Sequence, residues 1–239
     1  MLKFLITLSI ISFCAVLSFG TFSVQRVMEE RLASYNDEFT NCDSMDIDKT
    51  NQIFSYLTLN PGPDAKSLKL IGSALKRVRE LKLTDAKPLV RDIVDTMIDP
   101  TYVGNSDIDR EMKLNRHLAL MAFAALCSES SDAAILYGWY THRKLDNVSE
   151  YLIARTLFEM NKCTEAVKAV NGMLDLMASS DRSLADDAFV YTLLDAVEKQ
   201  GSRDSITHLF LVQKKFGNNH EIYNRISEVV GNLSTYGTN

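Results

Sequence analysis

From Asp48 onward, the chain is a succession of short segments in which apolar residues recur every three or four positions. This spacing places the apolar side chains on one face of an α-helix, because a helix completes a turn every 3.6 residues. After Asp64, for example, the stripe consists of Leu68, Ile71, Leu75 and Val78. No comparable run of period-two alternation, the mark of a half-buried strand, is found. The sequence therefore predicts an all-α fold.

Residues that start and stop helices separate these segments. The expected starts are Asp64, Thr84 or Asp85 with Pro88 in the first turn, Ser106, Asp132 and Ser183, where Ser106 with Asp109 and Ser183 with Asp186 form capping boxes. The expected stops are Pro61, Pro100, the serines at 128, 130 and 131, Asp146 with Asn147, and Gly201, Gly217 and Gly231. We expect about ten helices, and short turns favour antiparallel hairpins stacked in series.

The opening stretch from Phe4 to Gln25 contains no charged residue. As a helix it would reach about 33 Å, which is enough to cross the hydrocarbon core of a bilayer. Lys3 precedes it, and Ser18 and Gly20 lie three and one positions before a signal-peptidase cleavage after Gly20. Residues 1–25 are therefore expected to be a signal peptide or a transmembrane signal anchor. Either one places the protein on a membrane or outside the cytosol, in a periplasm or in the ER lumen and secretory pathway.

Charge is distributed unevenly behind this leader. Glu29 to Asp48 holds seven acidic residues against one arginine, and we interpret residues 26–62 as an acidic linker with the first helices. Residues 63–239 are expected to form the α-helical repeat domain. The net charge of −5 argues against a nucleic-acid partner, because binding to phosphates needs an excess of Lys and Arg.

A basic stretch follows the acidic one. Between Asp64 and Arg91 there are eight Lys or Arg residues against three acids. Its central members are Lys76, Arg77 and Arg79. They belong either to a solvated helix face or to a basic patch that meets anionic lipid head groups or an acidic partner.

Cysteines and glycosylation motifs bear on the compartment. Cys42, Cys127 and Cys163 follow the leader, and we interpret Cys127 and Cys163 as small core residues on helices. A disulfide between these two is the alternative, and it would require an oxidising compartment. Asn147 and Asn232 each begin an Asn-x-Ser triplet, the acceptor pattern for N-glycosylation.

Catalytic signatures are missing from the sequence. It has no Gly-rich phosphate loop, no Gly-x-Ser-x-Gly, no Cys-x-x-Cys and no His-Glu-x-x-His. We therefore predict no catalytic residue, no metal site and no cofactor. Tyr137, Trp139 and Tyr140 are candidates for a partner-binding groove, with core filling as the alternative.

Two stretches resemble known families of helix-hairpin repeats. Tyr151 to Val170 resembles a tetratricopeptide repeat, with Ala154 and Ala166 at its small positions and a turn at Asn161-Lys162. Leu118 to Ile135 can be laid over the same pattern. Tyr191 to Phe210, with its Lys199-Gln200-Gly201 turn, is similar to a pentatricopeptide repeat. Both resemblances imply a right-handed superhelix of stacked antiparallel helix hairpins.

The resemblance also implies a class of function. Tetratricopeptide repeats mostly bind proteins, whereas pentatricopeptide repeats mostly bind single-stranded RNA. The sequence thus favours a membrane-tethered or exported helical-repeat adaptor or assembly protein whose partners lie in the envelope or secretory pathway. Two alternatives stay open, an exported all-α enzyme of unknown reaction and an organellar RNA-binding repeat protein.

Overall fold

The computed structural model describes residues 47–57, 65–97, 107–141, 145–179 and 187–235. The chain divides into Met1–Asn36 and Asp37–Asn239, and every described residue belongs to the second part. The leader, most of the acidic segment, Cys42, and Ser106 and the residues of the Ser183 capping box lie outside the described residues. Within the described ranges, no helix is long and apolar enough to span a membrane.

The all-α prediction is confirmed, because the described residues form ten α-helices and a 3₁₀ turn and contain no strand. The helices are α2 (Ile47–Leu57), α3 (Ala65–Leu81), α4 (Lys87–Met97), α5 (Asp107–Leu126), α6 (Ser131–Thr141), α7 (Asn147–Glu159), α8 (Thr164–Ser179), α9 (Asp187–Gln200), α10 (Ser205–Lys215) and α11 (His220–Thr235), with the 3₁₀ turn η1 (Thr84–Ala86) before α4. Pro88 lies in the first turn of α4, as the sequence predicts.

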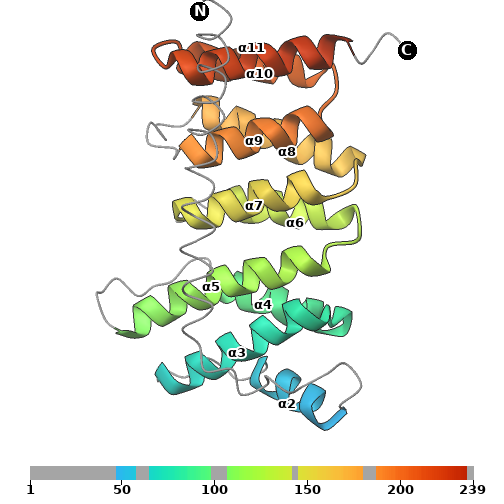
Figure 1. The fold of residues 1–239 in the computed structure, drawn as a ribbon, viewed down its shortest axis with the longest axis vertical. Coiled ribbons are helices and arrows are strands. Elements are labelled where there is room, and N and C mark those ends of the chain that lie inside the picture. The colour runs from blue at the N-terminus through green and yellow to red at the C-terminus, as the bar shows by residue number, and fades with distance from the viewer. Residues whose placement is uncertain (1–46, 58–64, 98–106, 142–144, 180–186, 236–239) are drawn as a thin grey trace, which may run out of the picture. The chain divides into compact units, whose positions relative to one another are not determined.

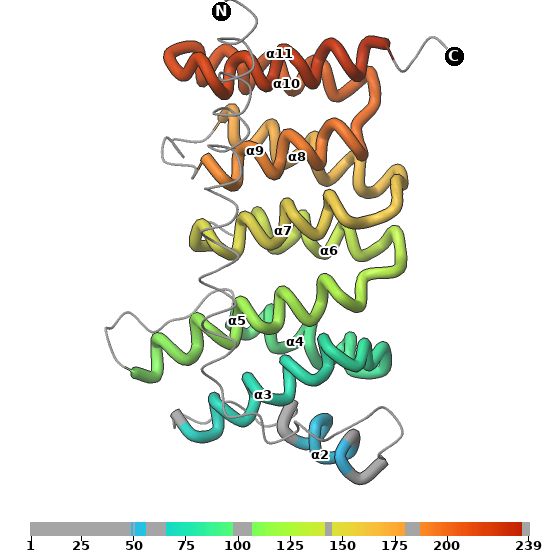
Figure 2. The backbone as a smooth tube through the Cα atoms, viewed as in Figure 1, coloured from blue at the N-terminus to red at the C-terminus, as the bar shows by residue number. Residues whose placement is uncertain are grey.

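Alternate helices form two layers (Figure 1). Helices α3, α5, α7, α9 and α11 pack on one another in that order, and α6, α8 and α10 pack in the same order behind them. The tube in Figure 2 follows the chain as it passes from one layer to the other and back. Each helix thus contacts its second neighbour along the chain, and consecutive helices such as α4 and α5 or α10 and α11 join the layers.

The core lies between the layers and is built from the predicted apolar stripes. Leu68, Ile71, Leu75 and Val78 of α3 are all at most 1% exposed. Helix α5 is buried on more than one face, because it packs against α3, α4 and α7. Full burial of one such aliphatic side chain stabilises the fold by about 1.5–3 kcal/mol. Ala154 and Ala166, the small residues of the Tyr151–Val170 stretch, are completely buried.

Side-chain donors tie the C-terminal ends of helices to other helices. Gln200 of α9 donates its amide N–H groups to the carbonyl oxygens of Leu157 and Met160 at the end of α7, at 2.9 and 2.8 Å. Lys215 of α10 donates to the Met177 carbonyl of α8 at 2.7 Å. The last carbonyls of a helix have no partner inside the helix, so each such bond satisfies a group that would otherwise be orphaned.

Four details of the sequence-based interpretation are corrected. Helix α6 ends at Thr141, and Asp146 instead caps the N-terminus of α7 by accepting the Ser149 backbone N–H at 2.8 Å. Gly231 lies inside α11 rather than at a helix end. Cys127 and Cys163 lie just outside helices and are half-buried. Both thiols are free, so the alternative of a Cys127–Cys163 disulfide is wrong.

Two glycines are expected to respond to alanine with opposite signs. A Cβ at Gly201 would overlap the Val197 carbonyl oxygen, which is backbone and cannot swing away. Gly201→Ala should therefore lower the free energy of unfolding by about 1–3 kcal/mol. A Cβ at Gly231 meets nothing within 4 Å, so Gly231→Ala should raise that free energy by about 0.5–1 kcal/mol through helix propensity. Urea unfolding measures both, and equal effects would contradict the packing at Gly201.

Helix α11 covers the end of the stack with a polar surface. Ile222, Ile226, Val229 and Leu233 form its single buried stripe. The opposite face exposes Glu221, Asn224, Ser227 and Glu228. Helix α11 thus buries one face against α9 and α10 and presents the other to water.

Candidate functional site

A cleft of about 780 Å³ opens where the C-terminal ends of α7 and α9 meet α11. Its lining comes from helix ends and turns: Phe158 of α7, Lys162 after it, Asp195, Glu198 and Lys199 of α9, Gly201, Ser202 and Arg203 of the next turn, and Leu233 of α11. Because α7, α9 and α11 are second neighbours, the cleft exists only when three successive helices of this layer are packed together.

Among the described residues, three exposed cations line the cleft, namely Lys162, Lys199 and Arg203. Lys162 donates to the Gly201 carbonyl oxygen at 2.8 Å, and Lys199 donates to the Phe158 carbonyl oxygen at 2.7 Å. The two lysines thus bridge the ends of α7 and α9 in opposite directions. An ammonium group carries three protons, so each lysine can hold a carbonyl and still donate to a ligand.

The two carboxylates of the cleft are held by Arg225 of α11. Its guanidinium donates to Asp195 at 2.7 Å and to Glu198 at 2.5 Å, and it also pairs with Glu228 at 2.9 Å. Burial alone would lower the pKa of Arg225, but these carboxylates outweigh it and raise the pKa. Arg225 offsets one of these three carboxylate charges, so together with Lys162, Lys199 and Arg203 the cleft keeps a small excess of positive charge.

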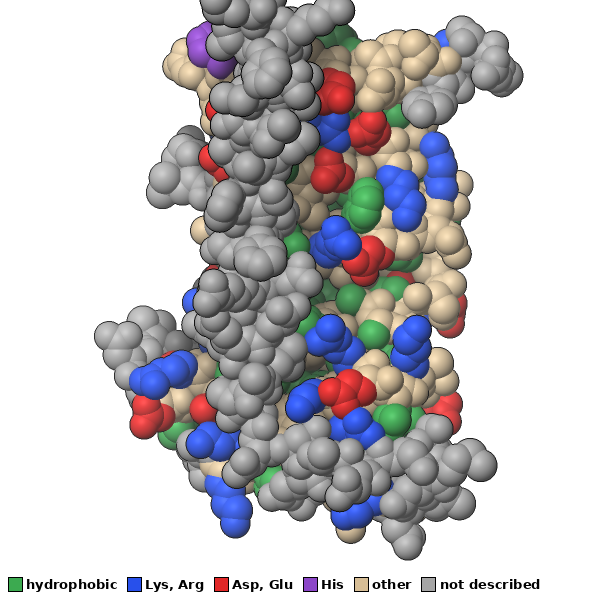
Figure 3. All heavy atoms as spheres, viewed as in Figure 1, with side chains coloured by type: hydrophobic (Ala, Val, Ile, Leu, Met, Phe, Trp, Pro, Cys, Tyr) green, Lys and Arg blue, Asp and Glu red, His purple; other side chains and the backbone are tan. Residues whose placement is uncertain are grey.

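Phe158 supplies an aromatic surface in the same cleft. Its ring lies 5.2 Å from the Arg155 guanidinium and 5.2 Å from the Lys199 ammonium, both measured to the ring centroid. These cation–π contacts hold the half-buried ring and one of the cleft's lysines together. Figure 3 shows the face to which α5, α7 and α9 belong, with basic and acidic side chains interspersed over it. The cleft therefore combines an apolar surface with charged donors.

The aromatic candidates from the sequence lie on α6, in the other layer. Trp139 is 3% exposed and Tyr140 is completely buried, so both fill the core. The Trp139 ring packs edge-to-face on Phe123 at 4.7 Å, and Tyr140 stacks on Phe189 at 5.7 Å. Tyr137 is half-buried, and its ring covers Gly172 of α8. The core interpretation of Trp139 and Tyr140 is thus confirmed, and their rings are not available on the surface.

The basic candidates Lys76, Arg77 and Arg79 lie in the second half of α3 and are half-buried. Arg77 forms an ion pair with Glu80 on the same helix. Helix α3 packs against α2 and α5, so these side chains are not part of the cleft formed by α7, α9 and α11. Their contact with lipid head groups or an acidic partner stays a prediction.

The two glycosylation candidates lie in different surroundings. Asn147 is exposed at the start of α7, whereas Ser149 of the same triplet is completely buried. Asn232 of α11 donates its side-chain amide to Glu198 at 2.5 Å, beside the Arg225 cluster. A glycan on Asn232 would replace a proton on this nitrogen and would sit next to the cleft.

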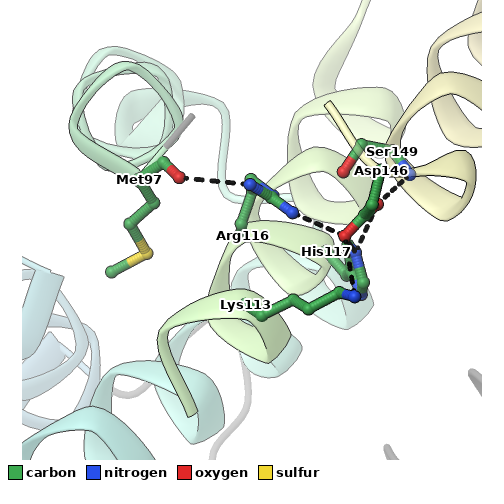
Figure 4. A network of polar contacts seen from close by, with 6 residues as sticks. All are labelled: Met97, Lys113, Arg116, His117, Asp146 and Ser149. Carbon is green, nitrogen blue, oxygen red and sulfur yellow. Dashed lines mark hydrogen bonds and ion pairs between the residues drawn. The ribbon is translucent and has the colours of Figure 1, made fainter. Parts of the chain in front are cut away.

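A second polar cluster lies between α5 and the start of α7, around the partly buried Asp146 (Figure 4). Its carboxylate accepts from Arg116 at 2.5 Å and from His117 Nε2 at 3.0 Å, and Lys113 lies at 3.4 Å. Burial alone would raise the pKa of Asp146, but the hydrogen bond from His117 and the charge of Arg116 hold that pKa well below its usual range. The carboxylate is therefore ionised and ties α5 to the start of α7.

Serine, histidine and aspartate meet in this cluster without the geometry of a nucleophilic triad. His117 bonds Asp146 through Nε2, while His117 Nδ1 and Ser149 Oγ have no hydrogen-bond partner. A triad needs the histidine to lie between the serine and the carboxylate, and His117 and Ser149 are both completely buried. The cluster thus connects helices, and burial lowers the pKa of His117.

Other reactive side chains of the described residues include the Cys127 thiol. Burial, helped by the Asp132 charge, raises the pKa of the Cys127 thiol to about 12, so it is protonated at neutral pH and a poor nucleophile. Among the described residues, no three His, Cys, Asp or Glu side chains are grouped so that they could hold a metal ion.

Comparison with known proteins assigns the chain to no family. No protein-family model matches the chain, and neither a curated protein nor a solved structure matches it. The likeness of Tyr151–Val170 and Tyr191–Phe210 to helix-hairpin repeats therefore stays a sequence-based prediction.

Proposed function

We propose that this chain is a helical-repeat adaptor that binds another protein through the cleft at the ends of α7 and α9. The observation that carries the proposal is the meeting of Lys162, Lys199 and Arg203 with the Phe158 ring in one open cleft. A peptide segment with acidic side chains and one apolar residue complements this lining. Carboxylates would meet the cations, and the apolar residue would cover Phe158.

The proposal also includes a cellular location, which rests on the N-terminal segment. Residues 1–25 are proposed to tether the array to a membrane or to direct its export, so that the partner is an envelope or secretory-pathway protein. The uncharged length of Phe4–Gln25 supports this part of the proposal. N-terminal sequencing of the native chain separates a signal removed after Gly20 from a retained anchor.

Site-specific cross-linking in the native cell tests the binding proposal. A photo-reactive amino acid at Ser202, which lines the cleft, should give a discrete cross-linked protein, whereas the same probe at Ser130 between α5 and α6 should not. Arg203→Glu should lower the yield by about fivefold, because it places a negative charge where the acidic segment binds.

The matched control is Arg110→Glu, which also reverses an exposed arginine, here one that pairs with Asp107 on α5. It should leave the Ser202 cross-link unchanged. The adaptor proposal fails if Ser202 and Ser130 give the same products. It also fails if the cross-linked species is single-stranded RNA whose binding falls steeply with salt, which would support the RNA-binding alternative.

A further inference from the structure

Helix α10 exposes its largest apolar residues on the surface of the rear layer. Ser205, Leu209 and Val212 are buried where α10 packs on α8 and α11. Phe210 is 53% exposed and Leu211 is 51% exposed. Residues three and four apart lie on one helix face, so Thr207, Phe210, Leu211 and Lys214 form one continuous exposed strip.

A groove of about 650 Å³ runs between this strip and α8. Its α8 wall consists of Asp175, Ala178 and Ser179, and its α10 wall consists of Leu211, Lys214 and Lys215. The α8 wall ends in the short side chains of Ala178 and Ser179, and Leu211 of the α10 wall is 51% exposed. An apolar side chain of a binding partner that enters the groove would contact Leu211 on one side and Ala178 on the other.

The charges around the groove favour an acidic occupant. Among the described residues, Asp175 is the one acid that lines it, and it accepts a bond from His208 Nδ1 of α10 at 2.6 Å. Lys214 is exposed, and Lys215 extends along the groove to the end of α8, where it bonds the Met177 carbonyl. Two lysines therefore flank the apolar centre on its C-terminal side.

We propose that the α8–α10 groove binds an acidic amphipathic helix of a partner protein. One apolar side chain of that helix enters between Ala178 and Leu211, and its carboxylates pair with Lys214 and Lys215. A groove between two helices accepts a helix lying along it, and an apolar centre flanked by lysines matches an acidic amphipathic helix. The groove belongs to the α8 and α10 layer and the Phe158 cleft to the α7, α9 and α11 layer, so both can be occupied together.

A designed peptide provides the test. The probe is a fluorescent peptide of about 14 residues, long enough for an induced helix, with leucines every third or fourth position and glutamates between them. A second peptide carries lysines in place of the glutamates. Fluorescence anisotropy is measured on the purified full chain. We expect the acidic peptide to bind and the basic peptide not to bind.

Substitutions in the α8–α10 groove test whether the acidic peptide binds there. Leu211→Asp should weaken binding of the acidic peptide by at least about tenfold, and Lys214→Glu by about three- to tenfold. Tyr223→Asp is the matched control, because Tyr223 is 41% exposed on α11 and lies outside the groove. It should bind the peptide like the unmodified chain.

Several results would overturn the proposal. The groove does not bind an acidic helix if the peptide fails to bind, if both peptides bind equally, or if Leu211→Asp binds as well as Tyr223→Asp. If a concentration-dependent dimer of the chain disappears in Leu211→Asp while the peptide does not bind, the occupant is a second copy. If binding to anionic vesicles is lost instead, the occupant is a lipid surface. A failure of the Ser202 cross-link would leave this proposal standing, since the two sites share no lining residue.

Discussion

Replacing Asp146 by alanine is expected to lower the free energy of unfolding by about 2–4 kcal/mol. The substitution removes the N-cap of α7 and leaves Arg116, which is 4% exposed, and His117, which is completely buried, without their shared carboxylate. A buried cation that loses its partner keeps the cost of desolvation. Urea unfolding at pH 7 measures the change.

Two further variants separate the charge from the cap. Asp146→Asn keeps an acceptor for the Ser149 N–H but removes the negative charge, so it should cost less than Asp146→Ala. Asp107→Ala removes an exposed carboxylate that pairs with Arg110 at 2.9 Å on α5, and it should change stability by at most about 0.5 kcal/mol. If Asp146→Ala costs no more than Asp107→Ala, the cluster does not hold α5 and α7 together.

The same cluster makes the fold sensitive to acid. Burial lowers the pKa of His117, so below pH 6.5, its ordinary pKa, the unfolded chain binds a proton that the folded chain resists. The pKa of Asp146 is also held low, so stability should fall again below about pH 4, where the unfolded carboxyl protonates. Both effects make the free energy of unfolding decrease as pH falls. His117→Gln should flatten the dependence just below pH 6.5, and an unchanged slope there would contradict this assignment.

Trp139→Ala is expected to cost about 3–5 kcal/mol of unfolding free energy. The ring is 3% exposed, packs on Phe123, and donates its Nε1–H to the Asp95 carboxylate of α4 at 2.6 Å. Alanine would leave a cavity between α4, α5 and α6 and would remove that bond. Thermal or urea unfolding gives the loss.

Milder substitutions show how much of this unfolding free energy comes from the aromatic ring and how much from the hydrogen bond to Asp95. Trp139→Phe keeps an aromatic ring against Phe123 and leaves the half-exposed Asp95 to water, so it should cost about 1–2 kcal/mol. Tyr137→Ala removes a half-buried ring and should cost less than Trp139→Ala. If Trp139→Ala instead leaves stability unchanged and abolishes capture of a partner, the ring belongs to a binding surface and its placement in the core is wrong.

The sequence predicts the helices well because their signals are local. The stripe of α3 and the bounds of α5 follow from residues within a few turns of each other, and η1 with α4 begins where Thr84 and Pro88 indicate. The end of α3 is not signalled. Helix α3 ends at Leu81, and the next residue, Lys82, has a φ of 50°, in the left-handed region that glycine usually occupies. The Leu83 N–H bonds the Val78 carbonyl there at 3.1 Å, so hydrogen bonding rather than residue type ends the helix.

The polar contacts between helices could not be predicted in this way. The sequence predicts a helix stop at Asp146. Only the packing of α5 on α7 shows that its carboxylate accepts hydrogen bonds from Arg116 and His117, which lie some 30 residues earlier. The cleft has a partial signal, because Lys162 and Lys199 each stand beside a predicted turn, where a cation can reach the carbonyls of a helix end. Which end each lysine reaches depends on the second-neighbour packing of α7 and α9.

Helix α11 limits how this stack of helices can be enlarged. A further helix pair placed against its outer side would have to bury Glu221, Asn224 and Glu228, whose desolvation costs free energy. Lengthening by duplication is therefore easier inside the series, between helices that already present apolar sides in both directions. An engineered version with more binding surface should gain its extra hairpin upstream of α10 and keep the present α10–α11 pair as its last element.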